Sequence, residues 1–151
     1  MHYLVFVLVP GVVGKPDIPL FVAIMLERYN ANLPIMGGVY PTNPRAEWDY
    51  WSIGGRWDGM VSGQSGDGTV RGYGKGLESK WARNTLKVSD LSPDAVPAVI
   101  ITPDGNWHNN CTDVKRFIDW SDRERKWDQK ARVILDQHRE CVIVAIDYHS
   151  W

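Results

Sequence analysis

The chain has 151 residues, with 17 lysines and arginines against 18 aspartates and glutamates, so its formal net charge is −1. This length is typical of one domain, and residues 1–151 are expected to form a single domain whose core needs neither a disulfide nor a metal. The balanced charge disfavours nucleic acid as the main ligand, because neutralising phosphates requires many lysines and arginines.

The compartment is predicted from the cysteines and from the first apolar segment. Cys111 and Cys141 lack the spacing of a metal site, and two reduced cysteines are typical of a cytoplasmic protein. A disulfide between the two remains an alternative. Tyr3–Val9 is too short to span a membrane and carries no cationic leader. We therefore expect a cytoplasmic protein without a membrane partner.

The N-terminal part of the chain predicts a strand followed by a helix. Tyr3–Val9 is a continuous apolar run rich in β-branched residues, which is typical of a central strand. Asp17 is a suitable N-cap for a helix that tolerates Pro19 in its first turn and ends near residues 30–32. The residues that follow helical spacing are Leu20, Phe21, Ile24, Met25 and Arg28.

The middle of the chain is expected to hold a second strand that bends at two glycines. Trp48–Ile53 enters this strand, and Arg56–Val61 is expected to continue it. Gly54 and Gly55 would then form a bulge or kink, because glycine adopts positive φ and lets another backbone come close. The glycine-rich residues 62–76 are interpreted as a mobile loop or a hairpin tip.

The C-terminal half predicts a hairpin, a long helix and a final buried strand. Pro sets φ and Gly accepts the left-handed position in the Pro-Asp-Gly sequence, so this sequence predicts a turn. The expected elements are a weak strand within 77–91, a strand at Ala98–Thr102, a turn at Pro103–Gly105, a returning arm at Trp107–His108, a helix within 112–139 and a strand at Cys141–Ile146.

The order of these elements is strand, helix, strand, strand, helix, strand. This order predicts an α+β fold, a ferredoxin-like βαββαβ two-layer sandwich with a glycine-rich insertion between the middle strands. Another two-layer α+β fold is the alternative.

The segment from Trp48 to Gly59 is the most unusual part of the sequence and reads W-D-Y-W-S-I-G-G-R-W-D-G. Indole faces stack on flat ligands, and the paired glycines allow a ligand to come close. The Arg56 guanidinium binds a carboxylate or phosphate in a bidentate manner. We interpret the segment as a pocket for a small anion that carries a base. The aromatic faces come from Trp48, Trp51 and Trp57.

A structural role is the alternative interpretation of the same segment. Asp49 or Asp58 would orient Arg56 or accept a hydrogen bond from a ligand. Equally, Arg56 would pair with one of these carboxylates, lie between two indoles and brace the sheet.

Three blocks of the sequence resemble an uncharacterised family of small phage and bacterial proteins. The run W-D-Y-W-S-I-G-G-R-W is similar to the family's W-D-[WY]-[YW]-x-I-G-G-R-W signature, and residues Ala98–His108 resemble its T-P-D-G-x-W-H block. Val144–His149 resembles its V-D-C-H ending, with Tyr148 in place of Cys. The resemblance implies a phage or prophage origin, hence the host cytoplasm, and no established activity. Because small phage proteins often counter host defence, a counter-defence role is a hypothesis by association.

Two histidines at strand ends suggest a second kind of site. His108 closes the hairpin and His149 leaves the last strand. If both approach Arg56, the three side chains form an acid–base or phosphate site. The alternative is two half-buried histidines that are hydrogen-bonded to the backbone. Asp147 and His149 lie two residues apart on a strand, but no full ligand set with metal spacing appears, so we expect no metal and no cofactor.

Binding of a nucleotide-like anion is the function that the sequence favours. A protein–protein inhibitor of a host defence enzyme is the first alternative, because eight tryptophans are present and Trp81 and Trp120 lie outside strong core patterns. A phosphodiester or nucleotide hydrolase that uses His108 and His149 is the second, and single-stranded nucleic acid is a weaker ligand candidate. The oligomeric state is left open, with a homodimer among the alternatives. The expected ligand-binding residues are Asp49, Trp51, Gly54, Gly55, Arg56, Trp57, His108 and His149.

Overall fold

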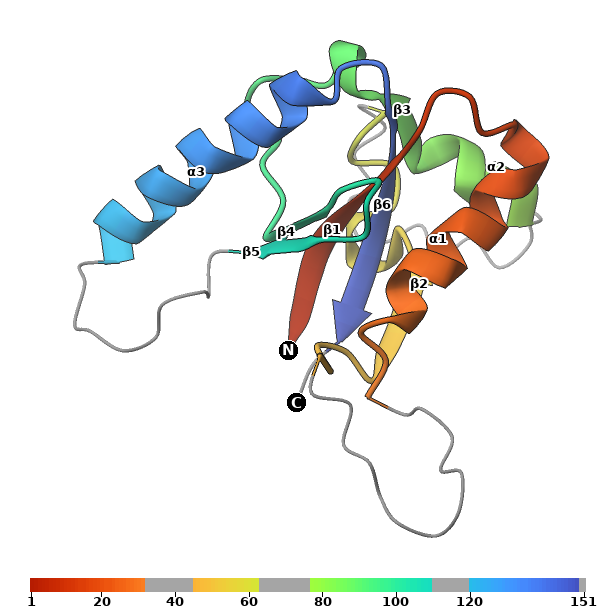
Figure 1. Ribbon diagram of the computed structural model, residues 1–151, viewed down its shortest axis with the longest axis horizontal. Helices are drawn as coiled ribbons and strands as arrows, with labels where there is room; N and C mark the ends of the chain where they lie inside the picture. The colour runs from red at the N-terminus through yellow and green to blue at the C-terminus, as the bar shows by residue number, and fades with distance from the viewer. Residues whose placement is uncertain (32–44, 63–76, 110–119, 150–151) are drawn as a thin grey trace, which may run out of the picture.

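The computed structural model describes residues 1–31, 45–62, 77–109 and 120–149. Within these residues six strands form one sheet that is flanked by helices (Figure 1). Cys111 and most of the predicted glycine-rich insertion lie outside the described residues, and the described Cys141 is buried as a free thiol. The elements are β1 (His2–Val9), η1 (Lys15–Asp17), α1 (Ile18–Glu27), β2 (Tyr50–Ile53), η2 (Gly55–Trp57), α2 (Leu77–Arg83), β3 (Thr85–Lys87), η3 (Val88–Asp90), β4 (Val99–Ile101), β5 (Trp107–Asn109), α3 (Trp120–Gln137) and β6 (Val142–His149).

The two terminal strands form the centre of the sheet. The strand order is β2-β6-β1-β4-β5, and β3 also pairs with β6. β1 runs antiparallel to β6 from the His2–His149 pair to the Val9–Val142 pair, and it runs parallel to β4. β4 and β5 form the predicted hairpin, in which Gly105 has a φ of 84°. The expected central positions of the first and last strands are therefore confirmed.

Helices cover both faces of this sheet, as Figure 1 shows for α1 and α3. Successive side chains of a strand point to opposite faces. On β1 the odd-numbered residues Val5, Val7 and Val9 pack in one apolar cluster with residues of α1. The even-numbered residues of the same strand pack in a second cluster with residues of α3. The centre of the sheet is thus buried on both faces, which is why β1 is apolar and buried from Leu4 to Val9.

The α+β class is confirmed, but the ferredoxin-like two-layer layout is not, and the strand order differs from it. In that layout both helices cover one face, and the strand after the first helix joins the far side of the third strand. Here α1 and α3 lie on opposite faces, and β2 joins the outer side of β6. The physical reason is the apolar surface of β1 and β6, because two helices on one face would leave half of it in water.

The chain between β2 and β4 also differs from the prediction. Arg56–Val61 does not continue the strand, because Gly54 and Gly55 take φ values of 68° and 49° and turn the backbone into η2. The positive φ expected at these glycines is confirmed. The weak strand predicted within 77–91 consists of the short helix α2 followed by the three-residue strand β3.

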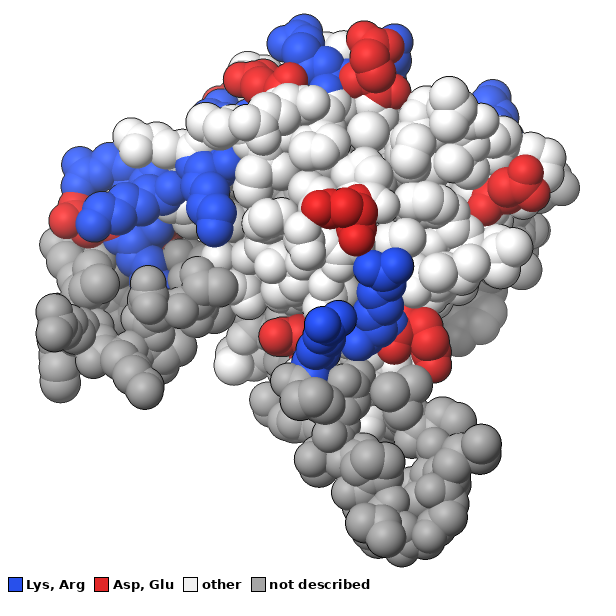
Figure 2. Space-filling view, in the orientation of Figure 1, with Lys and Arg blue, Asp and Glu red and all other residues white. Residues whose placement is uncertain are grey.

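α1 faces the core with a different side from the one that its sequence suggests. Its buried residues are Ile18, Val22, Met25 and Leu26, whereas Leu20 and Ile24 are exposed by 64% and 50%. Both sides of α1 are therefore apolar, and Figure 2 shows a broad uncharged surface over this helix. No helix within the described residues is long and apolar enough to cross a membrane.

Candidate functional site

A row of three ring side chains crosses one end of the sheet. His149 on β6 lies between Tyr50 of β2 and His2 of β1 in the strand register. Residues that are directly opposite on neighbouring strands point to the same face, with their Cβ atoms about 5 Å apart. The apolar cluster beneath α3 reaches Leu4 on this face and does not include His2. The row of Tyr50, His149 and His2, which we call the ring row, therefore lies at the end of the α3-side core.

Each histidine of the ring row is held by a carboxylate. His2 Nδ1 lies 3.0 Å from Asp147 Oδ1, and His149 Nδ1 lies 2.8 Å from Asp49 Oδ1. The two imidazole centroids are 5.0 Å apart, with the rings at 65°. An ionised carboxylate only accepts hydrogen bonds, so it selects the tautomer that carries its proton on Nδ1. Nε2 of each neutral ring is therefore an acceptor, and it becomes a donor when the ring is protonated.

The ring row is partly exposed to solvent, and the carboxylates of Asp49 and Asp147 hold its two histidines. The side chains of His2 and His149 are exposed by 28% and 36%, and Tyr50 is exposed by 60%. Neither Nε2 has a hydrogen-bond partner among the residues that the structure describes. The hydrogen bond from His149 holds the pKa of Asp49 below its usual value. Two anchored imidazoles thus present Nε2 atoms that are available to a ligand.

Asp147 joins this histidine pair to the Gly-Gly-Arg turn. Asp147 is buried, with 4% of the residue exposed. Its Oδ2 accepts a hydrogen bond from the Arg56 backbone N–H at 3.1 Å. A Cβ added at Gly55 would lie 2.3 Å from Asp147, so only glycine lets the turn come this close. The Arg56 side chain is exposed and makes no ion pair with any described residue. The side chain of Arg56 therefore faces solvent, while its backbone N–H is hydrogen-bonded to Asp147, the same carboxylate that holds His2.

A separate, partly buried network fixes the other end of the turn. Arg83 Nη2 donates to Asp58 Oδ2 at 2.7 Å, and Asn84 Nδ2 donates to Asp58 Oδ1 at 2.6 Å. The Asn84 Oδ1 atom accepts the Gly59 backbone N–H at 2.9 Å, and this asparagine is fully buried. Asp49 and Asp58 were the predicted partners of Arg56, but they bind His149 and Arg83 instead. The prediction that Arg56 itself braces the sheet by pairing with them is wrong, and Asn84 holds the turn.

The Asp58 network predicts that the free energy of unfolding falls as the pH is lowered. Burial acts to raise the pKa of Asp58, but the hydrogen bonds from Arg83 and Asn84 outweigh burial and hold it below its usual value. The unfolded carboxyl, with a pKa of about 4, then binds a proton first as the pH falls, so acid favours unfolding. Asp58→Asn should flatten the fall in the free energy of unfolding between about pH 5 and pH 2. Urea denaturation across this range measures it, and an equal flattening in the exposed control Asp94→Asn would contradict the assignment.

The tryptophans of the Trp48–Gly59 segment do not form one pocket. Trp51 lies opposite Tyr148 in the register and packs with the cluster beneath α1. Trp57 packs with the cluster beneath α3, on the other face of the sheet. Trp48 is buried, and its Nε1 donates to the Leu26 carbonyl at 2.8 Å. Trp48 is therefore buried, Trp51 and Trp57 are half-buried against opposite faces of the sheet, and the exposed ring of this segment is Tyr50.

His108 lies away from the ring row. In the strand order β5 is three strand spacings from β6, which is about 14 Å across the sheet. The Nε2 atom of His108 lies 3.3 Å from Thr102 Oγ1. Burial lowers the pKa of His108, and the positive charge of Lys130 lowers it further. The condition for a joint site of His108, His149 and Arg56, that both histidines approach the arginine, is thus not met, because the histidines are on β5 and β6, which are not adjacent strands.

Sequence reasoning missed three residues of the site. They are His2, Tyr50 and Asp147, none of which is among the ligand-binding residues that the sequence predicts. A period of two along β6 places Asp147 and His149 on one face, and the same period places His2 with Leu4. These alternations bring His2 close to Asp147 and His149 only because β1 pairs with β6, and the sequence alone does not show that pairing. Within the described residues, no group of three or more candidate ligands could hold a metal ion.

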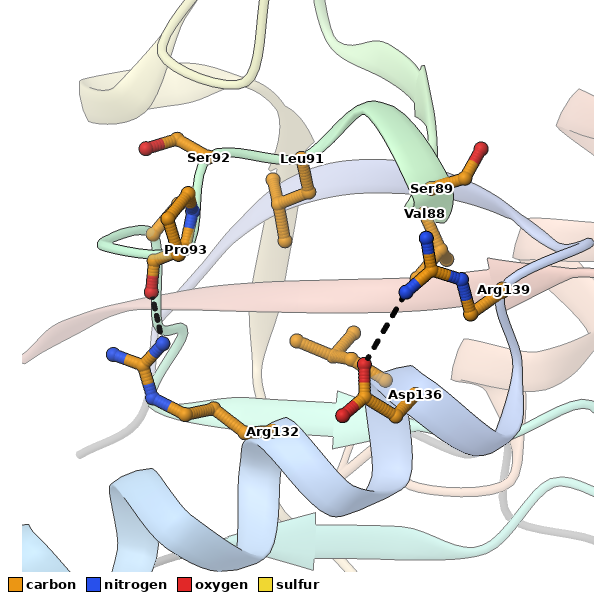
Figure 3. Close-up of a pocket in the computed structure, with 10 residues that line it drawn as sticks. Val88, Ser89, Leu91, Ser92, Pro93, Arg132, Asp136 and Arg139 are labelled. Atoms are coloured by element: carbon orange, nitrogen blue, oxygen red, sulfur yellow. Dashed lines mark hydrogen bonds and ion pairs between the residues drawn. The ribbon is translucent and has the colours of Figure 1, made fainter.

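A groove of about 390 Å³ lies between α3 and the segment after β3 (Figure 3). Arg132 donates a hydrogen bond to the Pro93 carbonyl across one end of the groove. At the other end, Arg139 Nη1 lies 3.7 Å from Asp136 Oδ1. Both arginines are thus engaged, and the Arg132 contact ties the segment to the helix. The groove is lined by Val88, Ser89, Leu91, Ser92, Pro93, Ala95, Arg132, Leu135, Asp136 and Arg139.

The chain has no match among protein-family models, curated proteins or solved structures. The likeness of the Trp48–Gly59 segment to small phage proteins therefore stays a prediction. Of the two tryptophans that suggested a protein interface, Trp81 is half-buried against the cluster beneath α1. The side chain of Trp120 lies outside the described part of the chain.

Proposed function

We propose that the ring row binds a nucleotide-like anion, with the phosphate on the histidines and the base on Tyr50. The pair of carboxylate-anchored imidazoles, with centroids 5.0 Å apart, is the observation that carries this proposal. Two donors fixed at this spacing suit the several oxygens of one phosphate, because each protonated Nε2 makes a charge-assisted hydrogen bond. Fixed rings also lose little conformational entropy when a ligand binds.

Arg56 supplies a further cation for the same anion. Its backbone nitrogen is bonded to Asp147, the carboxylate that holds His2, and its side chain is exposed. A guanidinium has five N–H donors and pairs with phosphate in a bidentate manner. Arg56 therefore retains the binding role that the sequence predicts, with His2 in place of His108.

Tyr50 supplies an exposed stacking face beside the histidines, whereas Trp51 and Trp57 are half-buried on opposite faces of the sheet. It is exposed and directly opposite His149, so its ring borders the phosphate donors. Stacking of a base on an aromatic side chain contributes about 1–3 kcal/mol. The resulting ligand class is a mononucleotide or a cyclic nucleotide. Sequestering such a signal would suit the counter-defence role suggested by the resemblance to phage proteins.

The binding test compares two histidines at different places in the sheet. Calorimetric titration and thermal shift with mono-, di- and cyclic nucleotides should show saturable binding by at least one member of the panel. His149→Gln and Arg56→Gln should each weaken binding at least tenfold, because each removes a charge-assisted bond worth about 1.5–3 kcal/mol. Tyr50→Ala should weaken nucleotides but not inorganic phosphate.

His108→Gln is the matched control, because His108 is half-buried on β5 and should leave affinity unchanged. No binding by any member of the panel, or equal losses in His108→Gln and His149→Gln, would refute the proposal. Chromatography of the nucleotide after incubation separates binding from hydrolysis. The anchored pair could act as general acid and general base, with His2 and His149 in these roles. A product that forms with the wild type and not with His149→Gln would establish that second function.

A further inference from the structure

α1 presents to solvent a stripe that is apolar in the middle and charged at both ends. Leu20 and Ile24 are exposed and one turn apart. Asp17 precedes them and Arg28 follows them, and both are exposed as well. Spacings of three or four residues place these four positions on one side of a helix. A helix that is apolar on both sides is typical of one that is covered on both sides.

The stripe is complementary to itself when a second copy is turned by 180°. An antiparallel pair of α1 helices that crosses near position 22 places Leu20 against Ile24 of the second copy. The same crossing places Asp17 near Arg28 of the second copy. Lys15, which is exposed, then lies near Glu27 of the second copy. A parallel pair would instead bring like charges together, so the charge pattern favours the antiparallel arrangement.

We propose that this face of α1 is the contact surface of a homodimer, covered by the same face of a second copy. A twofold dimer requires a patch that matches itself, and the acid–apolar–apolar–base order meets this requirement. Each end of the stripe carries one acid and one base, so the stripe has no cationic excess to attract anionic lipid. Figure 2 shows the uncharged surface that the second copy would cover.

The dimer should be weak and dependent on concentration. α1 has ten residues, so it is about 15 Å long, and one pair of such helices buries less than the roughly 1,200 Å² of a standard stable interface. α1 covers the face of the sheet opposite to the ring row. Dimerisation therefore leaves the proposed nucleotide site open, and the two proposals stand independently.

Sedimentation velocity over about 10 μM to 1 mM protein tests the proposal. The wild type should shift from monomer to dimer across this range, and Leu20→Glu should remain a monomer because it places a carboxylate against the apolar Ile24 of the second copy. The control is Val133→Glu, since Val133 is an apolar residue of α3 with 56% exposure and lies outside the stripe. Val133→Glu should dimerise as the wild type does, and far-ultraviolet circular dichroism should be unchanged in both variants.

Disulfide cross-linking tests the antiparallel register. In a Cys111→Ser background, a mixture of Leu20→Cys and Ile24→Cys chains should form a mixed disulfide faster than either chain forms one with itself. A wild type that is monomeric at every concentration overturns the proposal, as does a dimer that persists in Leu20→Glu. A monomer that binds vesicles of phosphatidylcholine and phosphatidylserine also overturns it, and would make the stripe a lipid contact.

Discussion

Gly55→Ala should destabilise the protein by about 3–5 kcal/mol, because it combines a strained backbone with a direct overlap. Gly55 has a φ of 49°, and a Cβ there would lie 2.3 Å from both Cβ and Oδ2 of Asp147. Asp147 is buried on the central strand β6, so it has little room to withdraw. Urea denaturation monitored by tryptophan fluorescence measures the loss. A loss of this size is a large part of the roughly 5–15 kcal/mol that stabilises a domain.

Gly14→Ala is the control for this prediction. Gly14 has a φ of −64°, and the nearest atom to an added Cβ is 3.7 Å away, which is ordinary contact. Alanine there should leave stability unchanged or raise it by about 0.4–1 kcal/mol, since it restricts the unfolded chain. Equal effects at Gly14 and Gly55 would show that the turn tolerates a side chain. Gly55→Ala should also weaken nucleotide binding, because a displaced Asp147 no longer holds His2.

Asn84→Ala should destabilise the protein by about 3 kcal/mol or more, since this one fully buried side chain satisfies three groups of the turn and of α2. Its amide binds the Gly59 N–H, the Asp58 carboxylate and the Lys80 carbonyl. Removal leaves these groups without their partner and creates a cavity under the turn. Denaturant unfolding measures the change. The control is Asn106→Ala, an exposed asparagine in the β4–β5 turn, which should change stability by no more than about 0.5 kcal/mol.

A double-mutant cycle separates the contribution of the turn from that of the asparagine. A Cβ at Gly54 would lie 2.5 Å from Asn84 Nδ2, so Gly54→Ala overlaps with the side chain that Asn84→Ala removes. Gly54→Ala should therefore cost less in the Asn84→Ala background than in the wild type, leaving mainly the cost of its φ of 68°. Strictly additive losses would mean that Asn84 moves aside without effect, and the network would not be the support of the turn.

The candidate site is formed by partly exposed side chains that three different strands bring together. Tyr50, His149 and His2 come from β2, β6 and β1, and they are up to 147 positions apart in the chain. Each of them taken alone is an ordinary half-exposed ring at a strand end. Their chemistry arises because the strand register places them in one row and because Asp49 and Asp147 fix the two imidazoles. Arg56 joins them through a turn that only two glycines permit.

Local patterns in the sequence determined several elements correctly. Continuous apolar runs gave the positions of β1 and β6, Pro-Asp-Gly gave the β4–β5 turn, and Gly54-Gly55 gave a backbone with positive φ. These features depend on one residue or on a few neighbours, so propensity and steric limits are sufficient to predict them. The same apolar runs are buried on both faces of the sheet, which the predicted two-layer sandwich did not take into account.

Tertiary structure alone decided which strands pair, which face each side chain takes and which charges meet. A one-residue change of register moves every side chain of a strand to the other face, so Trp51 and Trp57 could not be assigned to faces from their spacing. The partners of Asp49 and Asp58 depend on β6 and α2, which are far from them in the chain. α1 is apolar on both sides, so its own sequence does not tell which side meets the sheet. The sequence by itself determined the local elements because their causes are local, whereas the site required contacts between distant residues that only the packed sheet creates.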